Sequence, residues 1–321
     1  MAPDDNRRMT TTSTTKGAPE GVVRLDDWGL IRAQGPDAAS FLHGQLTNDI
    51  AHLGAGEARL AGYCSAKGRL LASFVVWRAG DDILLACSAD LLAATLRRLR
   101  MFVLRAKCTL SDASGESPLH GLAGAAAARW LGAAVPAAAW HTNRLDGATL
   151  VRLPDAAGAP RFLCAGLAAP PSLPELDAQA WRRLEVLSGV ARIKAATAEQ
   201  FVPQMVNYEL IGGVDFRKGC YPGQEIVARS QYRGSVKRRS LLFETDGAAR
   251  AGAEVFDADD PSQPAGQVVN AATGEAGSVA LVEVKLAAAA AGRLRVGAPD
   301  GAALRPLPMP YEVPLEAVAA G

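Results

Sequence analysis

The connections between the apolar runs in the first third of the chain are too short for anything but antiparallel strands. Three runs, "ARLAGYCS", "RLLASFVVW" and "DILLACS", follow one another within residues 58–88 and are punctuated by "AKG" and "AGD". Tight turns join antiparallel neighbours, whereas parallel strands need a crossover of a dozen residues or more. The segment therefore predicts hairpins and excludes a βαβ series.

The residues before this segment predict a strand pair followed by a helix. Residues 21–34 fit a hairpin that turns at Asp26 and Asp27. Pro36 then fits the first position of a helix, because its fixed φ suits a helical start and its missing N–H costs nothing there.

Later segments have the spacing of amphipathic helices. Asp90 is placed to cap "LLAATLRRLR". Residues 177–188 predict a second helix, with Ala180, Leu184 and Leu187 as its buried stripe. A third helix is expected around "AAAARWLG", and "TLVRLPDAAGAPRFLCAG" predicts another hairpin.

The pattern changes near residue 236. From Arg239 onward, short strand-like runs are divided by Gly, Pro and Asp, which is typical of a small antiparallel barrel. The fold class expected is α+β. We expect a disordered, Thr-rich tail over residues 1–20, an α+β region over 21–236 and a C-terminal β-barrel over 237–321.

Charge and hydropathy restrict the class of protein. The formal net charge is only +1, so the molecule as a whole is not an electrostatic binder of nucleic acid. No run of about 18 apolar residues is present, so no membrane-spanning helix is expected. The polar N-terminal segment has no apolar core of a secretory signal, which makes the cytoplasm the expected compartment.

The cysteines predict neither a disulfide framework nor a metal site. Their number is odd and no two have C-x-x-C spacing, so we expect no metal held by this chain alone. Four lie in apolar runs and fit small buried side chains. The fifth, Cys220, has polar and turn-forming neighbours instead. The five are Cys64, Cys87, Cys108, Cys164 and Cys220.

The four histidines have no spacing typical of ligands or of a catalytic triad. Isolated histidines are more often surface or helix-cap residues than functional ones. They are His43, His52, His120 and His141.

Cys220 lies in "KGCYPGQEIVARSQYRG", a stretch with the composition of a tight turn. Gly219 and Gly223 permit unusual backbone conformations and Pro222 fixes one dihedral angle, so the turn holds the thiol in a defined place. A cation such as Lys218 favours the reactive thiolate. One interpretation is a positioned, activated thiol, and the other is a structural turn with an incidental small residue.

A basic run follows, formed by Arg229, Arg233, Lys237, Arg238 and Arg239. It fits a solvated strand edge, or a site for an anion such as a phosphate backbone or a carboxylate tail. No nucleic-acid recognition motif accompanies it, so contact with nucleic acid stays open but unsupported. Neither a P-loop nor a dinucleotide-binding glycine motif is present.

The segment "FVPQMVNYELIGGVDFRKGCYPGQEIVAR" resembles the signature of the YgfZ-type folate-binding proteins, relatives of the aminomethyltransferase T-protein of the glycine cleavage system. "LDDWGL", "FLHGQLTNDI", "CSAKGRLLAS", "AWRRLEVLSG" and "PLPMPY" are also similar, in family order. The resemblance covers almost the whole chain after residue 21. The family hallmark is K-G-C-[FY]-x-G-Q-E followed by an arginine. The residues that match this hallmark are Lys218, Gly219, Cys220, Tyr221, Gly223, Gln224, Glu225 and Arg229.

The resemblance implies two α+β subdomains and the barrel, arranged around a central cavity that holds tetrahydrofolate or a derivative. Trp28 and Trp181 match tryptophans associated with folate, and an indole offers a large face for a flat pterin. Family members support iron–sulfur enzymes by acting in cluster assembly or repair, and thereby support tRNA modification. Iron–sulfur proteins or assembly factors are the implied partners, with Cys220 as the functional thiol beside the cavity.

Two departures from the family pattern concern carboxylates. The aminomethyltransferases place an aspartate where this chain has Leu71, Ala72 and Ser73, which argues against aminomethyl transfer because these cannot replace a positioned carboxylate. Relatives often carry a pterin-binding glutamate where this chain has Leu187. Glu185 lies two positions earlier, about 200° around a helix, and is therefore a doubtful substitute.

Three hypotheses follow. The leading one is a folate-binding accessory factor for iron–sulfur proteins that uses Cys220. The others are a folate-dependent aminomethyl or one-carbon transferase and an RNA-contacting module built on the basic run, which could also meet the glutamate tail of folate. The sequence does not decide whether the chain is an enzyme.

Overall fold

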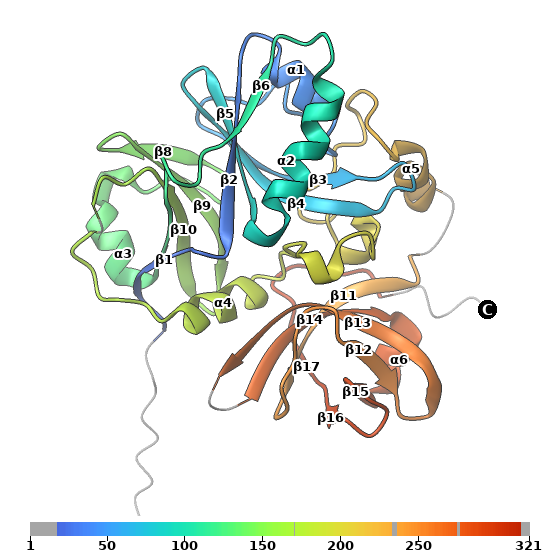
Figure 1. Cartoon of the computed structure of the whole chain (residues 1–321). Coiled ribbons are helices and arrows are strands. Elements are labelled where there is room, and N and C mark those ends of the chain that lie inside the picture. Colours follow the sequence, from blue (N-terminus) through green and yellow to red (C-terminus); the bar gives the residue numbers. More distant parts are fainter. Residues whose placement is uncertain (1–17, 170, 233–235, 275–276, 316–321) are drawn as a thin grey trace, which may run out of the picture.

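Three antiparallel sheets form the body of the molecule, and Figure 1 shows them as three lobes around a shared centre. The computed structural model describes residues 18–169, 171–232, 236–274 and 277–315. The predicted disordered tail, residues 1–20, lies outside the described part except for its last three residues. The α+β class and the C-terminal barrel are confirmed, because the third sheet is a nearly closed seven-stranded antiparallel barrel.

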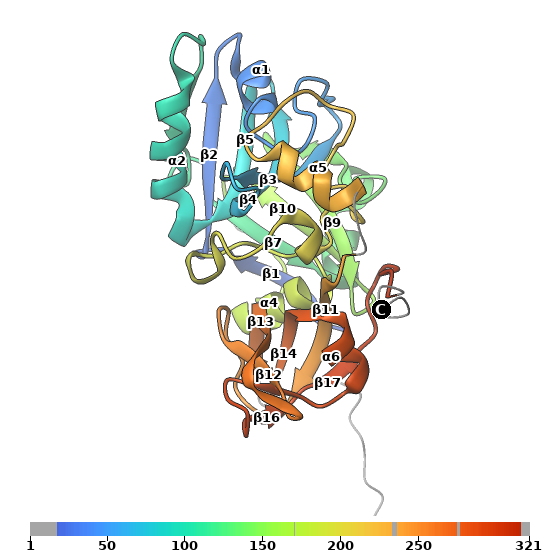
Figure 2. The same cartoon turned by 90° about the vertical axis from the view of Figure 1, so that its right-hand side faces the viewer.

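The sheet at the top of Figure 1 contains the predicted run of hairpins. Helix α2 packs against β2 and β6, and Figure 2 shows it along one face of this sheet. In spatial order the strands are β3 (Ala58–Cys64), β4 (Leu70–Ala79), β5 (Asp82–Ser88), β2 (Trp28–Gln34) and β6 (Thr109–Asp112), and the helices are α1 (Ala38–His43) and α2 (Ala89–Val103).

The sheet at the left of Figure 1 contains the second predicted hairpin as its β9–β10 pair. Its strands, in spatial order, are β1 (Gly21–Arg24), β7 (Leu119–Ala123), β10 (Ala159–Ala165), β9 (Ala148–Ala156) and β8 (Thr142–Leu145). Its helical elements are α3 (Gly124–Leu131) and η1 (Gly132–Ala134), and α4 (Ala178–Leu187) lies between this sheet and the barrel.

The barrel at the bottom of Figure 1 begins at Arg238 and contains every strand predicted for this region. In spatial order its strands are β16 (Ala302–Ala303), β15 (Leu294–Val296), β12 (Glu254–Asp257), β13 (Asp260–Gly274), β14 (Gly277–Lys285), β11 (Arg238–Thr245) and β17 (Arg305–Leu307). Its helix is α6 (Leu286–Ala291). Before the barrel, the chain passes through η2 (Ala195–Thr197), η3 (Pro203–Val206) and α5 (Gln224–Tyr232).

The hairpin predicted over residues 21–34 is wrong, although both strands form. β1 pairs with β7 in one sheet, whereas β2 pairs with β5 and β6 in the other. The chain does turn near Asp26, but the Leu25 amide continues the pairing with β7 by donating to the Leu119 carbonyl at 2.9 Å. The turn therefore passes the chain from one sheet to the next.

The buried face of α4 also differs from the prediction. Asp177 caps the helix, and its carboxylate accepts hydrogen bonds from the Gln179 and Ala180 amides. Trp181, Leu184 and Val186 are buried, rather than Ala180 and Leu187. Trp181 is only 1 % exposed and lies directly over Gly121 of β7. The indole fits against the sheet because Gly121 has no side chain.

Helix α2 begins one residue earlier than the predicted cap. Ser88 occupies the N-cap position and Asp90 lies inside the first turn. The Asp90 carboxylate instead accepts a hydrogen bond of 3.0 Å from the Ala195 amide. This contact ties α2 to η2, on the segment that leads to the barrel.

Side-chain amides join the barrel to the rest of the molecule. Asn207, after η3, donates to the Ser240 carbonyl on β11 at 2.7 Å. Asn270 on β13 accepts from the Arg192 amide at 2.9 Å and donates to the Arg192 carbonyl at 2.7 Å. These groups are buried, so leaving any of them without a hydrogen-bond partner would cost free energy. The hydrogen bonds therefore fix the orientation of the barrel.

The contact between Gly121 and Trp181 generates a prediction. A methyl group on Gly121 would lie 2.8 Å from three atoms of the indole ring, so Gly121→Ala must displace the ring. We expect the free energy of unfolding to fall by about 1–3 kcal/mol, measured by urea denaturation. Gly56→Ala is the matched control, because a methyl group there meets no atom within 4 Å. Equal midpoints for both variants would contradict the packing argument.

Candidate functional site

A central cavity opens where the three sheets meet. All three sheets, α4 and the segment before η2 contribute to its wall. The lining residues are Trp28, Leu60, Ser73, Phe74, Val75, Ala86, Trp140, Leu153, Pro154, Arg161, Arg182, Glu185, Val186, Ser188, Val190, Ala191, Arg192, Lys194, Asn270 and Ala271.

Trp28 and Glu185 meet in this wall. The indole Nε1 of Trp28, the first residue of β2, donates to Glu185 Oε1 at 2.9 Å. Glu185 projects from α4, and its side chain is only 15 % exposed. Sequence reasoning treated it as doubtful because of its place in the helix, but the structure orients its carboxylate into the cavity wall. It is the one carboxylate among the described residues that line the cavity.

Arg192 fixes both of these groups. Its guanidinium lies 4.6 Å from the centre of the Trp28 ring and donates to Glu185 Oε2 at 3.3 Å. It also donates to the carbonyl oxygen and to Oδ2 of Asp27, both at 2.7 Å. Burial acts to lower the pKa of Arg192, but the Glu185 and Asp27 carboxylates outweigh it and raise the pKa. Arg192 is therefore cationic at neutral pH.

Arg161, which lines the cavity, forms a second cation–aromatic pair with Trp181. Arg161 is buried, and its Nε and Nη2 atoms donate to the Pro154 carbonyl at 3.0 and 2.9 Å. Its guanidinium lies 5.6 Å from the centre of the Trp181 ring. Burial lowers the pKa of Arg161 to about 10, which leaves it cationic at neutral pH. Trp181 does not itself line the cavity but supports the arginine that does.

Further cations surround Asp27 at the same side of the cavity. The Oδ2 atom of Asp27 lies 3.5 Å from Arg182 Nε and 3.6 Å from Lys194 Nζ, in addition to its bond with Arg192. Burial acts to raise the pKa of Asp27, but these cations lower it. Three cations face one aspartate here, so the local charge favours an anion.

The thiol loop, residues 218–223, is held in place by close packing. Tyr221 is buried, whereas Cys220 is exposed. Gly223 has a φ of +77°, and a methyl group there would lie 2.4 Å from the Ser65 carbonyl oxygen. Only glycine fits this left-handed position against the β3–β4 turn. The turn predicted around Cys220 is present, although Gly219 has no positive φ.

The ammonium group of Lys218 binds main-chain carbonyl oxygens. Its Nζ atom donates to the carbonyls of His43 and Leu46, the latter at 2.7 Å, and lies 4.8 Å from the centre of the Tyr221 ring. Burial lowers the pKa of Lys218 to about 8. Its first role is therefore to fasten the loop to the end of α1.

The other hallmark residues begin the next helix. Gln224 is the first residue of α5 and is partly buried, whereas Glu225 and Arg229 are exposed. Cys220 does not line the central cavity, and neither does any other residue of the hallmark. The expectation of a thiol at the cavity rim is thus corrected. The loop packs on the β3–β4 turn, whereas the cavity is lined by the middle of those two strands.

Two residues of the basic run are already paired with carboxylates. Arg238 binds both carboxylate oxygens of Glu283, at 2.5 and 2.8 Å. Arg239 is buried and binds Glu209. Arg233 lies outside the described residues. The interpretation of the run as an anion site is therefore not supported, because two of its arginines neutralise carboxylates of the chain itself.

Sequence reasoning missed Arg161 and Arg192, and the signals for them were weak. Arg161 follows a proline in a predicted strand, where a charged residue facing inward has no pattern of its own. Arg192 lies in "SGVARIKAAT", between recognisable elements. Arg192 acquires its role from Asp27, 165 residues away, and Arg161 from Pro154 on the neighbouring strand and Trp181 on α4.

Within the described parts of the chain, no three His, Cys, Asp or Glu side chains are grouped to hold a metal ion. None of the helices in the same residues combines the length and apolarity that a bilayer crossing requires.

Several proteins are similar to this chain. "tRNA-modifying protein YgfZ" of Edwardsiella ictaluri is 35 % identical over 250 residues, which is 72 % of this chain and 73 % of that protein. The proteins of the same name from Sodalis glossinidius and Yersinia pestis are 33 % and 30 % identical, over 68 % and 92 % of this chain and 70 % and 94 % of their own lengths. No protein-family model matches.

A solved structure shares the fold. The glycine cleavage system aminomethyltransferase T from Bartonella henselae superimposes with a TM-score of 0.69 over 93 % of this chain and 86 % of that one, at 19 % identity. That likeness concerns the architecture alone. Together with the identity to the named relatives over most of their length, it confirms the resemblance seen in the sequence. The chain belongs to the YgfZ family.

Proposed function

We propose that this protein binds tetrahydrofolate or a derivative in the central cavity and supports iron–sulfur proteins, and thereby tRNA modification, with Cys220 as its working thiol. The observation that supports folate most is the meeting of Trp28 and Glu185 in the wall of the central cavity. A flat aromatic face beside a largely shielded carboxylate is what a pterin requires.

The residues present fit the chemistry of a folate. A pterin carries N–H donors along one edge, and a carboxylate has more lone pairs than Trp28 and Arg192 use on Glu185. Phe74, Val75 and Leu153 supply apolar wall, and the half-buried Trp28 supplies an indole. The chemistry that the folate would supply is that of a one-carbon carrier. The protein's own part is to bind and orient it.

The anionic tail of the ligand has partners at the same site. Arg182 and Lys194 line the cavity and share Asp27 with Arg192, and the buried Arg161 has no carboxylate partner among the ion pairs of the described residues. These cations are better placed to bind a glutamate carboxylate than the basic run is, because Arg238 and Arg239 of that run are already paired. We assign the tail to this side of the cavity.

The position of Cys220 favours an accessory role. An exposed thiol on a rigid loop, away from the cavity, is accessible to a second protein. Three relatives are named tRNA-modifying proteins, and a thiol that serves an iron–sulfur client of tRNA modification fits both facts. The expected compartment is the cytoplasm, where such a thiol stays reduced.

Aminomethyl transfer is the second candidate, because the aminomethyltransferase shares the fold. The structure gives it no further support. Ser73 lines the cavity, but its hydroxyl accepts a hydrogen bond of 2.9 Å from the Ile193 amide. Neither Leu71 nor Ala72 offers a carboxylate, so the group needed to handle a proton or a cation there is missing.

Folate binding is tested by calorimetry with tetrahydrofolate under anaerobic conditions. Glu185→Gln removes the charge but keeps the shape, and Trp28→Ala removes the aromatic face. We expect each to raise Kd by about 10-fold or more, since a hydrogen bond to a charged group contributes about 1.5–3 kcal/mol. Trp130→Ala on α3 is the control and should bind normally. Absence of binding by the wild-type protein would remove folate from the proposal.

The role of Cys220 is tested by complementation. A bacterial strain that lacks its own family member is given wild type, Cys220→Ala or the control Cys108→Ala, and methylthiolated nucleosides are measured in hydrolysed tRNA. We expect Cys220→Ala to abolish the modification while its Tm stays within about 2 °C of wild type, because the side chain is exposed. Full modification by this variant would show that the thiol is dispensable.

A further inference from the structure

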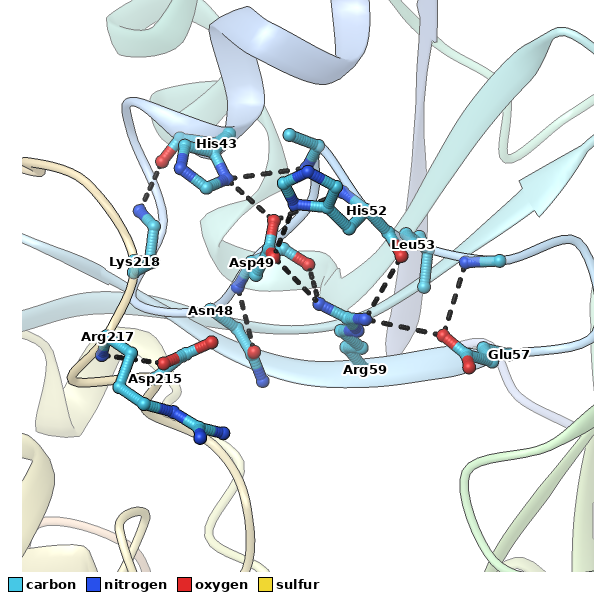
Figure 3. A network of polar contacts seen from close by, with 12 residues as sticks. His43, Asn48, Asp49, His52, Leu53, Glu57, Arg59, Asp215, Arg217 and Lys218 are labelled. Carbon is cyan, nitrogen blue, oxygen red and sulfur yellow. Dashed lines mark hydrogen bonds and ion pairs between the residues drawn. The ribbon is translucent and has the colours of Figure 1, made fainter.

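A histidine–aspartate pair lies beside the thiol loop, and neither residue was identified as functional from the sequence. His43 is the last residue of α1, and its Nδ1 atom lies 2.8 Å from Asp49 Oδ1 (Figure 3). Asp49 follows six residues later, in the connection to β3. Both side chains are largely shielded, with 20 % and 17 % of their surfaces exposed.

Asp49 is held as a carboxylate. Burial acts to raise its pKa, but hydrogen bonds from His52, through side chain and backbone, and from His43 lower it to about 2. Arg59 adds a cation 3.8 Å from Oδ2 and also donates to the Asp49 carbonyl, as Figure 3 shows. Asp49 is therefore ionised throughout the neutral range and can only accept hydrogen bonds.

This fixes the tautomer of His43. A nitrogen 2.8 Å from a carboxylate oxygen must carry the proton, so Nδ1 is the donor. The Ala51 amide also points at Nδ1, but at 3.4 Å its contact is the weaker one. In the neutral imidazole, Nε2 is then the basic nitrogen with a free lone pair.

The free nitrogen faces the thiol loop. A methyl group added to Gly219 would lie 3.6 Å from His43 Nε2, so this atom is next to the residue that precedes Cys220. Lys218, on the other side of Gly219, donates to the His43 carbonyl and fastens the loop to the same helix end. Histidine and loop are thus held together by a buried cation, not by chance proximity at the surface.

We propose that the Asp49–His43 pair is the proton acceptor for the Cys220 thiol. The S–H bond breaks, a bond forms between that proton and His43 Nε2, and the neutral pair becomes a thiolate and an imidazolium. Asp49 balances the imidazolium through the Nδ1 bond, as the acidic member of other nucleophile–base–carboxylate arrangements does. The inference rests on the proposed function only in taking Cys220 as the working thiol.

The other charged groups around His43 agree with this role. Lys218 brings a positive charge to the loop, and Arg59 and Asp49 form an ion pair on the far side of the ring. The Asp215 carboxylate accepts a hydrogen bond of 2.7 Å from the Arg217 amide, so it is directed at the backbone of its own loop. His52 binds the second oxygen of Asp49 from the solvent side, with 82 % of its side chain exposed.

The experiment is the pH profile of Cys220 alkylation by iodoacetamide, followed by mass spectrometry of the peptide. An ordinary thiol is only a few per cent ionised at pH 7, so a proton acceptor accelerates the reaction there. We expect His43→Gln to slow alkylation at pH 7 by about tenfold, and to move the midpoint of the profile towards that of an ordinary thiol. At pH 10 the rates of variant and wild type should converge.

His52→Gln is the matched control. It removes a similar hydrogen bond from the same carboxylate but no group near the loop, so we expect less than a twofold change. Thermal melting confirms that each variant is folded, and Asp49→Asn should reproduce the His43→Gln profile. An unchanged profile for folded His43→Gln would overturn the inference. Because alkylation needs neither folate nor a client protein, failure of the proposed function would leave this result intact.

Discussion

The arrangement of the three sheets depends on the contacts of one buried side chain, Arg192. Its guanidinium binds Asp27 at the junction between the first two strands and Glu185 on α4, and it stacks on Trp28. Its backbone forms both hydrogen bonds with Asn270 of the barrel. Breaking a buried ion pair by removing one partner costs several kcal/mol, so these contacts must form together. The cavity is the space that this junction leaves open.

The same junction determines what the cavity can bind. Glu185 offers a hydrogen-bond acceptor because Arg192 and Trp28 hold it in the wall, and the surrounding cations favour an anionic ligand. The thiol loop is a separate unit, fastened by Lys218 and the β3–β4 turn. A ligand in the cavity and a partner at Cys220 would therefore occupy different places, joined through β3 and β4.

Local patterns anticipated the elements well. The three hairpin-linked strands and the barrel strands formed as predicted, because short turns between apolar runs leave few alternatives. Pairing beyond the nearest neighbour was not predictable in this way. The strands on either side of Asp26 entered different sheets, since whether β1 finds β7 depends on a strand almost a hundred residues away. Trp181 likewise became buried because a distant glycine leaves room for it.

The sequence alone determined the α+β class, the barrel and the turn at Cys220, but not the exposure of that thiol or the partial exposure of Cys108. These depend on neighbouring residues and on hydrophobic patterning, which are local. Only the tertiary structure decided which charges meet. It turned Glu185 into the cavity, paired Arg238 and Arg239 with carboxylates, and brought His43 to the thiol loop. Electrostatic partners are set by distance and burial in three dimensions, and spacing along the chain does not encode either.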